Sequence, residues 1–131
     1  MGLMADYLLD TNVLIAWFGK CEGYGILQSL LERSDSRFFT SVLCAAEFLA
    51  GCAPNDARAL RNIVESSEVV IIPFDNLTQA ESAARLRKSL GLKMPDAIIA
   101  SAAKENNLIL CTLDKDFAVK AAAEIKIYFA T

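Results

Sequence analysis

The chain has 131 residues, 54% of them hydrophobic, which suits a single compact domain with a full core and no need for disulfides or a structural metal. Its net charge of −3 at pH 7 argues against a protein that coats nucleic acid through bulk positive charge, but it leaves local binding open. The sequence contains no histidine, which excludes Ser-His and Cys-His nucleophilic catalysis and disfavours a typical zinc enzyme.

Apolar runs of strand length alternate with segments of helical period along the whole chain, which predicts a parallel sheet covered by helices. The loops are short, with no repeat or low-complexity segment, so residues 1–131 are expected to form one α/β domain. The expected strands lie near residues 6–10, 36–40, 68–72, 108–112 and 125–129. The expected helices lie near residues 12–18, 23–34, 41–51, 55–66, 76–90, 95–105 and 115–123.

Three helix ends carry their own signals. Asp75 or Asn76 can cap the helix that follows, and Gln79 stands in the capping-box position relative to Asn76. Gly91, which follows a basic stretch, predicts a helix end. Pro95 suits the first turn of the next helix, where its missing N–H costs nothing.

The sequence predicts neither a membrane segment nor a redox centre. The longest apolar stretches fall well short of the roughly 20 residues that span a bilayer, and the beginning of the chain lacks the pattern of a secretory signal. A cytoplasmic location is therefore expected. The cysteines form no Cys-x-x-Cys pair and are expected to be reduced thiols; they are Cys21, Cys44, Cys52 and Cys111.

Four acidic residues stand in apolar surroundings, and three have an ordinary structural explanation. Asp10 can cap the helix that follows it, Asp96 can favour a first helical turn, and Asp114 can begin a turn. Glu47 is harder to explain, because its neighbours on a helix are small and apolar, with no basic partner in reach. Burial there requires a cation or a distant Arg, unless Glu47 lies on a cleft wall.

Together, the four acids predict a metal site. The strands before Asp10 and Asp114 would be neighbours, and the helices beginning near residues 41 and 95 can bring Glu47 and Asp96 to the same sheet edge. Two carboxylates about 4 Å apart repel by roughly 4 kcal/mol at an effective dielectric constant near 20, so a cluster needs positive charge. Oxygen ligands favour Mg²⁺ or Mn²⁺. Such an ion suits phosphodiester hydrolysis by activated water, which needs no histidine.

Four segments resemble, in order and spacing, the signature segments of the PIN-domain family. They are LLDTNVLI (8–15), SVLCAAE (41–47), PDAIIA (95–100) and CTLDKDF (111–117). The resemblance covers nearly the whole chain and is greatest to the VapC-type toxins of prokaryotic toxin–antitoxin pairs. It implies a PIN-like α/β fold with a parallel sheet of four to five strands in the order 3-2-1-4-5, and an Mg²⁺- or Mn²⁺-dependent endoribonuclease.

The resemblance also implies roles for individual residues. Carried over by position, the catalytic acids would be Asp10, Glu47, Asp96 and Asp114. The metal ligands would be Asp10, Asp96 and Asp114, with Asp116 as an accessory carboxylate. Many toxin-type relatives have Asn in place of Asp114, so which of Asp114 and Asp116 lies closer to the metal stays open. The side chains that support the acids or the metal-bound water would be Asn12 and Thr112.

Partners follow from the resemblance in the same way. Relatives of this type form homodimers and bind a small antitoxin that covers the acidic site. Arg87 and Lys93 belong to a basic run before Asp96, and they either contact RNA phosphate or lie on a solvated helix face. The apolar pattern at residues 26–31 either lines an antitoxin groove or packs in the core.

Other functions are less consistent with the residues present. A HAD-type phosphohydrolase expects a second Asp where Asn12 stands. A receiver domain could use Asp75 but needs adjacent acids after the first strand and a Lys after the last strand. A non-catalytic PIN-like binding module and a solitary RNA-processing nuclease without an antitoxin remain as alternatives.

Overall fold

The computed structural model describes residues 5–19, 28–29, 32 and 35–129. Five strands form one sheet in the order β3-β2-β1-β4-β5, and every neighbouring pair is parallel. Both the predicted fold class and the predicted strand order are confirmed. The strands are β1 (Ala5–Leu9), β2 (Ser36–Ser41), β3 (Val69–Ile72), β4 (Ile109–Thr112) and β5 (Ile127–Phe129).

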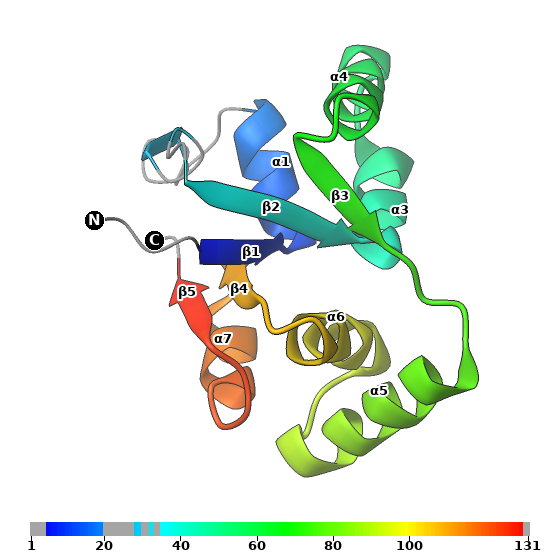
Figure 1. Ribbon diagram of the computed structural model, residues 1–131, viewed down its shortest axis with the longest axis vertical. Helices are drawn as coiled ribbons and strands as arrows, with labels where there is room; N and C mark the ends of the chain where they lie inside the picture. The colour runs from blue at the N-terminus through cyan, green and yellow to red at the C-terminus, as the bar shows by residue number, and fades with distance from the viewer. Residues whose placement is uncertain (1–4, 20–27, 30–31, 33–34, 130–131) are drawn as a thin grey trace.

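Helices cover both faces of the sheet. In Figure 1, α1, α3 and α4 lie on one side of the sheet and α6 and α7 on the other, with α5 outside α6. No helix of the described ranges is long and apolar enough to cross a membrane. The helices are α1 (Thr11–Gly19), α3 (Val42–Gly51), α4 (Pro54–Glu65), α5 (Leu77–Leu90), α6 (Met94–Glu105) and α7 (Lys115–Ala121).

The expected boundaries of these elements are correct to within two residues. The expected helix at residues 23–34 and the apolar pattern at residues 26–31 lie largely outside the described residues, as does Cys21. The accuracy has a simple cause, since the central strands β1 and β4 are short apolar runs buried on both faces. Leu8, Leu9 and Leu110 have no exposed surface.

The three predicted helix ends are present, with a small difference in the capping of α5. The side chain of Asn76 accepts a hydrogen bond from the Gln79 N–H (2.9 Å), so Asn76 rather than Asp75 is the cap. The Gln79 side chain accepts from the Asp75 N–H (2.6 Å), one residue before the position expected for a capping box. Gly91 ends α5 with a φ of 67°, and Pro95 lies in the first turn of α6.

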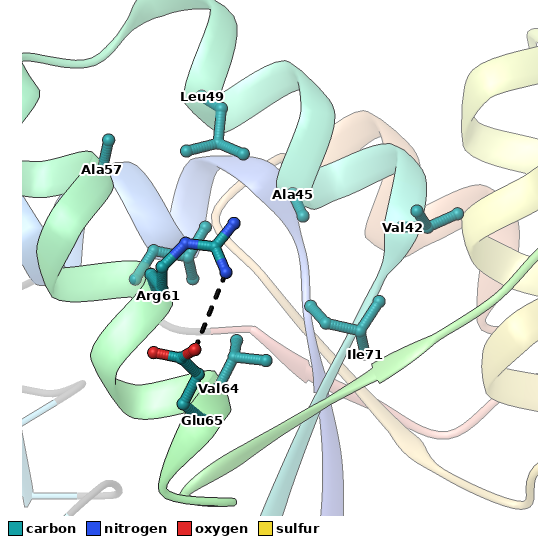
Figure 2. Close-up of a pocket in the computed structure, with 9 residues that line it drawn as sticks. Val42, Ala45, Leu49, Ala57, Arg61, Val64, Glu65 and Ile71 are labelled. Carbon is teal, nitrogen blue, oxygen red and sulfur yellow. Dashed lines mark ion pairs between the residues drawn. The ribbon is translucent and has the colours of Figure 1, made fainter.

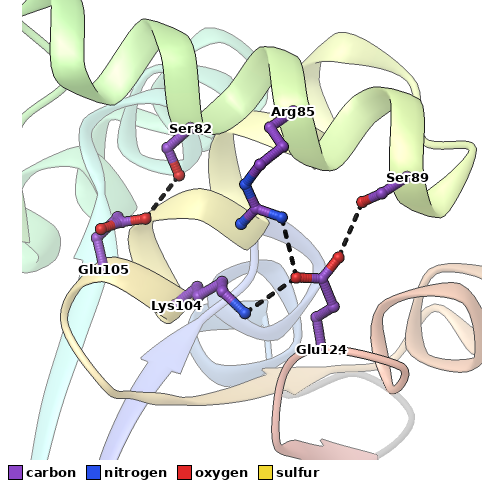
Figure 3. Close-up of polar contacts among 6 residues, drawn as sticks. All are labelled: Ser82, Arg85, Ser89, Lys104, Glu105 and Glu124. Carbon is purple, nitrogen blue, oxygen red and sulfur yellow. Dashed lines mark hydrogen bonds and ion pairs between the residues drawn. The ribbon is translucent and has the colours of Figure 1, made fainter.

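An ion-pair cluster ties α5 and α6 to the turn that follows α7. In Figure 3 the Glu124 side chain points from that turn towards Arg85 and Ser89 of α5 and Lys104 of α6. Its carboxylate accepts from Arg85 (3.1 Å) and Ser89 (2.8 Å) of α5 and from Lys104 (3.0 Å) of α6. These contacts lower the pKa of Glu124 to about 2. Glu124 therefore holds the α5–α6 pair, which carries Asp96 at the start of α6, against the last part of the domain.

Candidate active site

Asp10 is a buried carboxylate at the point where β1 ends and α1 begins. Its backbone N–H donates to the Cys111 carbonyl (3.0 Å), which continues the pairing of β1 with β4. The residue is only 5% exposed. Its Oδ1 accepts from the Thr11 N–H (2.8 Å), whereas a helix cap accepts from the second or third residue of the helix. Helix capping alone therefore does not explain Asp10.

The hydrogen bonds around Asp10 allow one arrangement of protons. Asn12 Oδ1 accepts from the Leu113 N–H (3.0 Å), so Asn12 Nδ2 faces Asp10 and Thr112, at 3.4 Å from each acceptor. The Thr112 hydroxyl accepts from this amide and from the Asp114 N–H (3.0 Å). With both lone pairs used, it donates its proton to Asp10 Oδ2 (2.8 Å). Asn12 and Thr112 thus both hydrogen-bond to Asp10 Oδ2.

Burial and neighbouring negative charges raise the pKa of Asp10, whereas these hydrogen bonds lower it. Burial raises the pKa of Asp10 to about 6, although the hydrogen bonds from Thr112 and Thr11 act in the opposite direction. The negative charges of Asp96 and Asp114 contribute smaller parts of this rise. At neutral pH most Asp10 side chains are therefore ionised. Two of the acids with which Asp10 was predicted to cluster, Asp96 and Asp114, affect its pKa.

Asp96 completes the electrostatic link between the four acids. It is half-buried in the first turn of α6. Burial raises the pKa of Asp96, and the charges of Asp114 and Glu47 raise it as well. Two cations, Lys93 and Lys120, act in the opposite direction. The sheet topology thus brings acids from four separate segments of the chain within electrostatic reach.

Glu47 and Asp114 are the two exposed members of the four-acid set. Glu47 is exposed, and its Oε1 accepts from the Thr11 hydroxyl (2.8 Å). It lines a cleft of about 210 Å³ with Ile15 and Phe48, so the cleft-wall alternative holds. Asp114 is also exposed, and it caps α7 by accepting from the Phe117 N–H (3.2 Å). For Asp114, the capping role and the electrostatic link to Asp10 coexist.

Asp116, the expected accessory ligand, forms an ion pair with Lys120. It is an exposed residue of α7, and its Oδ2 lies 3.2 Å from Nζ of Lys120. Lys93 is the exposed residue that immediately precedes α6. Arg87 is exposed in the last turn of α5.

Sequence reasoning missed Thr11, which binds Glu47, and Lys120, which acts on Asp96. The spacing of Lys120 four residues after Asp116 was the available signal for the second of these.

The donor set of the cluster suits a hard divalent cation. Four negatively charged carboxylates supply only oxygen, the ligand that Mg²⁺ and Mn²⁺ prefer. Within the described part of the chain, no three acidic or thiol side chains are arranged around one point as a metal centre. Side-chain rotation would be needed to bring the oxygens together. At the exposed residues Glu47 and Asp114 it would release the hydrogen bonds from the Thr11 hydroxyl and the Phe117 N–H. By the chemistry of its donors, the site fits the expected ion.

The buried thiols beside Asp10 are not reactive groups. Cys44 Sγ lies 3.9 Å from Asp10 Oδ1, and burial raises the pKa of Cys44. Burial and the charge of Asp10 raise the pKa of Cys111 to about 12. Both thiols are free and stay protonated at neutral pH. The expectation of buried, unpaired thiols is confirmed for Cys44 and Cys111, whereas Cys52 is a free thiol that is only partly buried.

An apolar pocket of about 240 Å³ lies apart from the acids, between α3, α4 and β3. Figure 2 shows Val42, Ala45 and Leu49 of α3 lining one wall. Glu47 is two residues from both Ala45 and Leu49, so it lies about 200° around the helix axis from each of them. It contacts Thr11 of α1 instead. The pocket and the acid cluster are therefore on different sides of α3.

Comparison with known proteins places the chain in a defined group. Residues 7–123 match the family described as PIN domain. No curated protein sequence matches the chain. Among solved structures, the chain is similar to a toxin–antitoxin complex from Klebsiella pneumoniae, with 32% identity, a TM-score of 0.68, and coverage of 86% of this chain and 90% of that chain.

Two further structures are similar over nearly their whole length. VapBC-5, a toxin–antitoxin system from Mycobacterium tuberculosis, has 27% identity and a TM-score of 0.64, with coverage of 95% of this chain and 98% of that chain. VapBC2 from Rickettsia felis, bound to a DNA fragment from its promoter, has 21% identity and a TM-score of 0.71, with coverage of 96% and 99%. The second likeness concerns the fold alone.

Proposed function

This chain belongs to the PIN domain family, and we propose that it is a metal-dependent endoribonuclease and the toxin of a toxin–antitoxin pair. The similarity to VapBC structures supports a nuclease of the toxin–antitoxin class. RNA as substrate and a divalent metal as cofactor are the further content of the proposal. The observation that carries it is the buried, hydrogen-bonded Asp10, whose pKa is raised in part by the charges of Asp96 and Asp114.

Mg²⁺ or Mn²⁺ would be held by Asp10, Asp96 and Asp114. When bound, such an ion lowers the pKa of a water molecule and neutralises charge on the phosphoryl oxygens. Thr112 and Asn12 keep the Asp10 carboxylate in one orientation through their hydrogen bonds to Oδ2. Thr11 holds Glu47 by donating to its Oε1, and we assign to Glu47 the acceptance of a proton during hydrolysis.

The proposed partners follow from the toxin–antitoxin class. We propose that the chain binds a small antitoxin protein, forms a homodimer and acts on RNA. A cytoplasmic location follows from that substrate, and no membrane partner is proposed.

An inactive PIN-like binding module would keep the same fold but would not cleave RNA. A solitary RNA-processing nuclease would cleave RNA without an antitoxin. Measurements of RNA cleavage distinguish the toxin from an inactive binding module. Copurification with the product of a neighbouring gene distinguishes it from a solitary nuclease.

The central test is degradation of single-stranded RNA with Mg²⁺, with Mn²⁺ and with EDTA. The native chain is compared with Asp10→Asn, Asp96→Asn and the matched control Asp75→Asn, which changes an exposed acid outside the cluster. We expect metal-dependent cleavage that falls roughly 100- to 1,000-fold in the two site variants, as for the loss of a group that stabilises transition-state charge. The control should retain activity. Equal rates in all four proteins, or rates indifferent to EDTA, would contradict the proposal.

A further inference from the structure

Lys120 lies at the same edge of the sheet as the four acids. It is in the last turn of α7, and its Nζ lies 3.2 Å from Oδ2 of Asp116 in the first turn. Side chains on a helix lean towards its N-terminus, and this ion pair places the ammonium group beside the first turn. That turn follows Asp114, the cap of α7. The charge of Lys120 also acts on Asp96, whose pKa it lowers.

The ion pair between Lys120 and Asp116 is weakly held. The side chain of Asp116 is 79% exposed and that of Lys120 is 44% exposed. Exposed ion pairs four residues apart on a helix contribute little to stability, because water and salt screen both charges. The lysine can therefore exchange its carboxylate partner for another anion at small cost.

Other basic residues of the fold are held more firmly. Arg85 and Lys104 both bind Glu124, whose side chain is only 23% exposed and which also accepts from Ser89. Breaking those contacts would loosen the attachment of α5 and α6. Lys120 has no comparable structural role, since its acid partner belongs to the same helix and tethers no second element.

A nucleic acid strand needs positive charge at this edge. The acid cluster repels phosphate, so a strand that reaches it must be held by cations on the rim. Lys93 immediately precedes α6, whose first turn holds Asp96, and the ion pair of Lys120 places its ammonium group beside the first turn of α7, which follows Asp114. They come from different elements, which allows them to bind different positions of one strand.

We propose that Lys120 binds a backbone phosphate of the RNA strand, and that Asp116 is its partner in the free protein rather than a metal ligand. The inference rests on the proposed function and adds a substrate-binding residue to it. It also answers the question left open by the sequence, because it assigns Asp114 to the metal and Asp116 to the lysine. Binding of RNA exchanges one anion for another at the Lys120 ammonium group and involves no bond making or breaking.

Salt-dependent binding of RNA tests the role of Lys120. In the Asp10→Asn background, a fluorescein-labelled single-stranded RNA is titrated by anisotropy at several salt concentrations in Mg²⁺. Lys120→Gln should weaken binding roughly 3- to 10-fold and reduce the slope of log K against log salt by about 0.7, the value for one contact to single-stranded phosphate. The matched control is Lys126→Gln, since Lys126 is exposed just before β5, at the opposite edge of the parallel sheet. Its affinity and slope should be unchanged.

Asp116→Asn tests the second half of the inference. It should leave the affinity for Mn²⁺, measured by calorimetry in the otherwise native chain, within about twofold, and RNA binding should be equal or tighter because Lys120 is released. Loss of Mn²⁺ affinity would overturn the assignment of Asp116. RNA binding by the background protein with no effect of Lys120→Gln would overturn the role of Lys120 but leave the nuclease proposal standing. Absence of RNA binding, together with absence of cleavage by the native chain, would overturn both.

Discussion

The hydroxyl of Thr112 donates to Oδ2 of Asp10 at 2.8 Å, and both residues are buried. The same hydroxyl accepts the Asp114 N–H at the start of the segment that leads into α7. One oxygen atom therefore fixes the orientation of Asp10 and the path of the chain that carries Asp114. Thr112 ends β4, the strand next to β1, and contacts both Asp10 and the backbone of Asp114. It therefore fixes the position of one acid relative to the other.

Replacement of this hydroxyl should affect both stability and activity. Thr112→Val keeps the shape of the side chain but leaves Asp10 and the Asp114 N–H without the hydroxyl. We expect a loss of roughly 1–3 kcal/mol in the free energy of unfolding, because a buried partner is left unsatisfied. The rate of RNA cleavage by Thr112→Val should also fall, because Asp10 loses the hydrogen bond that orients it. Thr112→Ser retains the hydroxyl and is the control; a Ser variant as impaired as the Val variant would contradict the role assigned to the hydrogen bonds.

Metal binding should stabilise the native chain against heat. An ion that binds only the folded protein, present at a concentration 100 times its dissociation constant, adds about 2.7 kcal/mol to the free energy of unfolding. Mn²⁺ should therefore raise the Tm of the native chain, and EDTA should reverse the rise. Asp10→Asn and Asp96→Asn should lose most of the shift, whereas Glu81→Gln, which changes an exposed acid of α5, should keep it. The same shift in all these proteins would indicate non-specific binding.

Glu124 should make stability depend on acid pH. Its folded-state pKa, about 2, lies below the ordinary value of 4.5, because Lys104, Ser89 and Arg85 favour the charged form. The stabilisation is therefore complete above about pH 5 and is lost as pH falls towards 2. Glu124→Gln lacks it, so urea unfolding should show the largest difference from the native chain near pH 7 and a vanishing difference near pH 2. High salt should also narrow the difference. A difference that is constant across pH would contradict this account.

Much of the fold could be predicted from the sequence because strand and helix signals agree along the chain. The run before Asp10 is short, apolar and followed at once by a helix, and it forms the central strand β1. The acids could be predicted to meet because parallel neighbouring strands end at one edge. Asp10 and Asp114, which follow the neighbouring strands β1 and β4, illustrate this, since the charge of Asp114 acts on Asp10.

The details of the site depend on side-chain geometry that the sequence pattern does not carry. Helix α3 is apolar on nearly every side, so its sequence could not indicate that Val42, Glu47 and Leu49 face solvent. The sequence therefore left open whether Glu47 is buried beside a cation or lies on a cleft wall, and Glu47 lies on a cleft wall. The contact of Lys120 with Asp116 depends in the same way on where two flexible side chains meet.

Two glycines provide a matched test of backbone conformation. Gly91 has a φ of 67°, in the left-handed region, and a Cβ built there would meet no atom within 4 Å. The cost of Gly91→Ala is therefore conformational rather than steric, and we expect a loss of roughly 1–2 kcal/mol in the free energy of unfolding. Asn tolerates this conformation better, so Gly91→Asn should cost less.

Gly51, the last residue of α3, is the control for this pair of variants. A Cβ there also meets no atom within 4 Å, but the residue lies within a helix. Gly51→Ala should leave stability unchanged or raise it by up to about 1 kcal/mol, because alanine loses less backbone entropy on folding. Urea unfolding of the three variants measures the difference. Equal effects of alanine at the two positions would show that the left-handed turn after α5 is not what Gly91 provides.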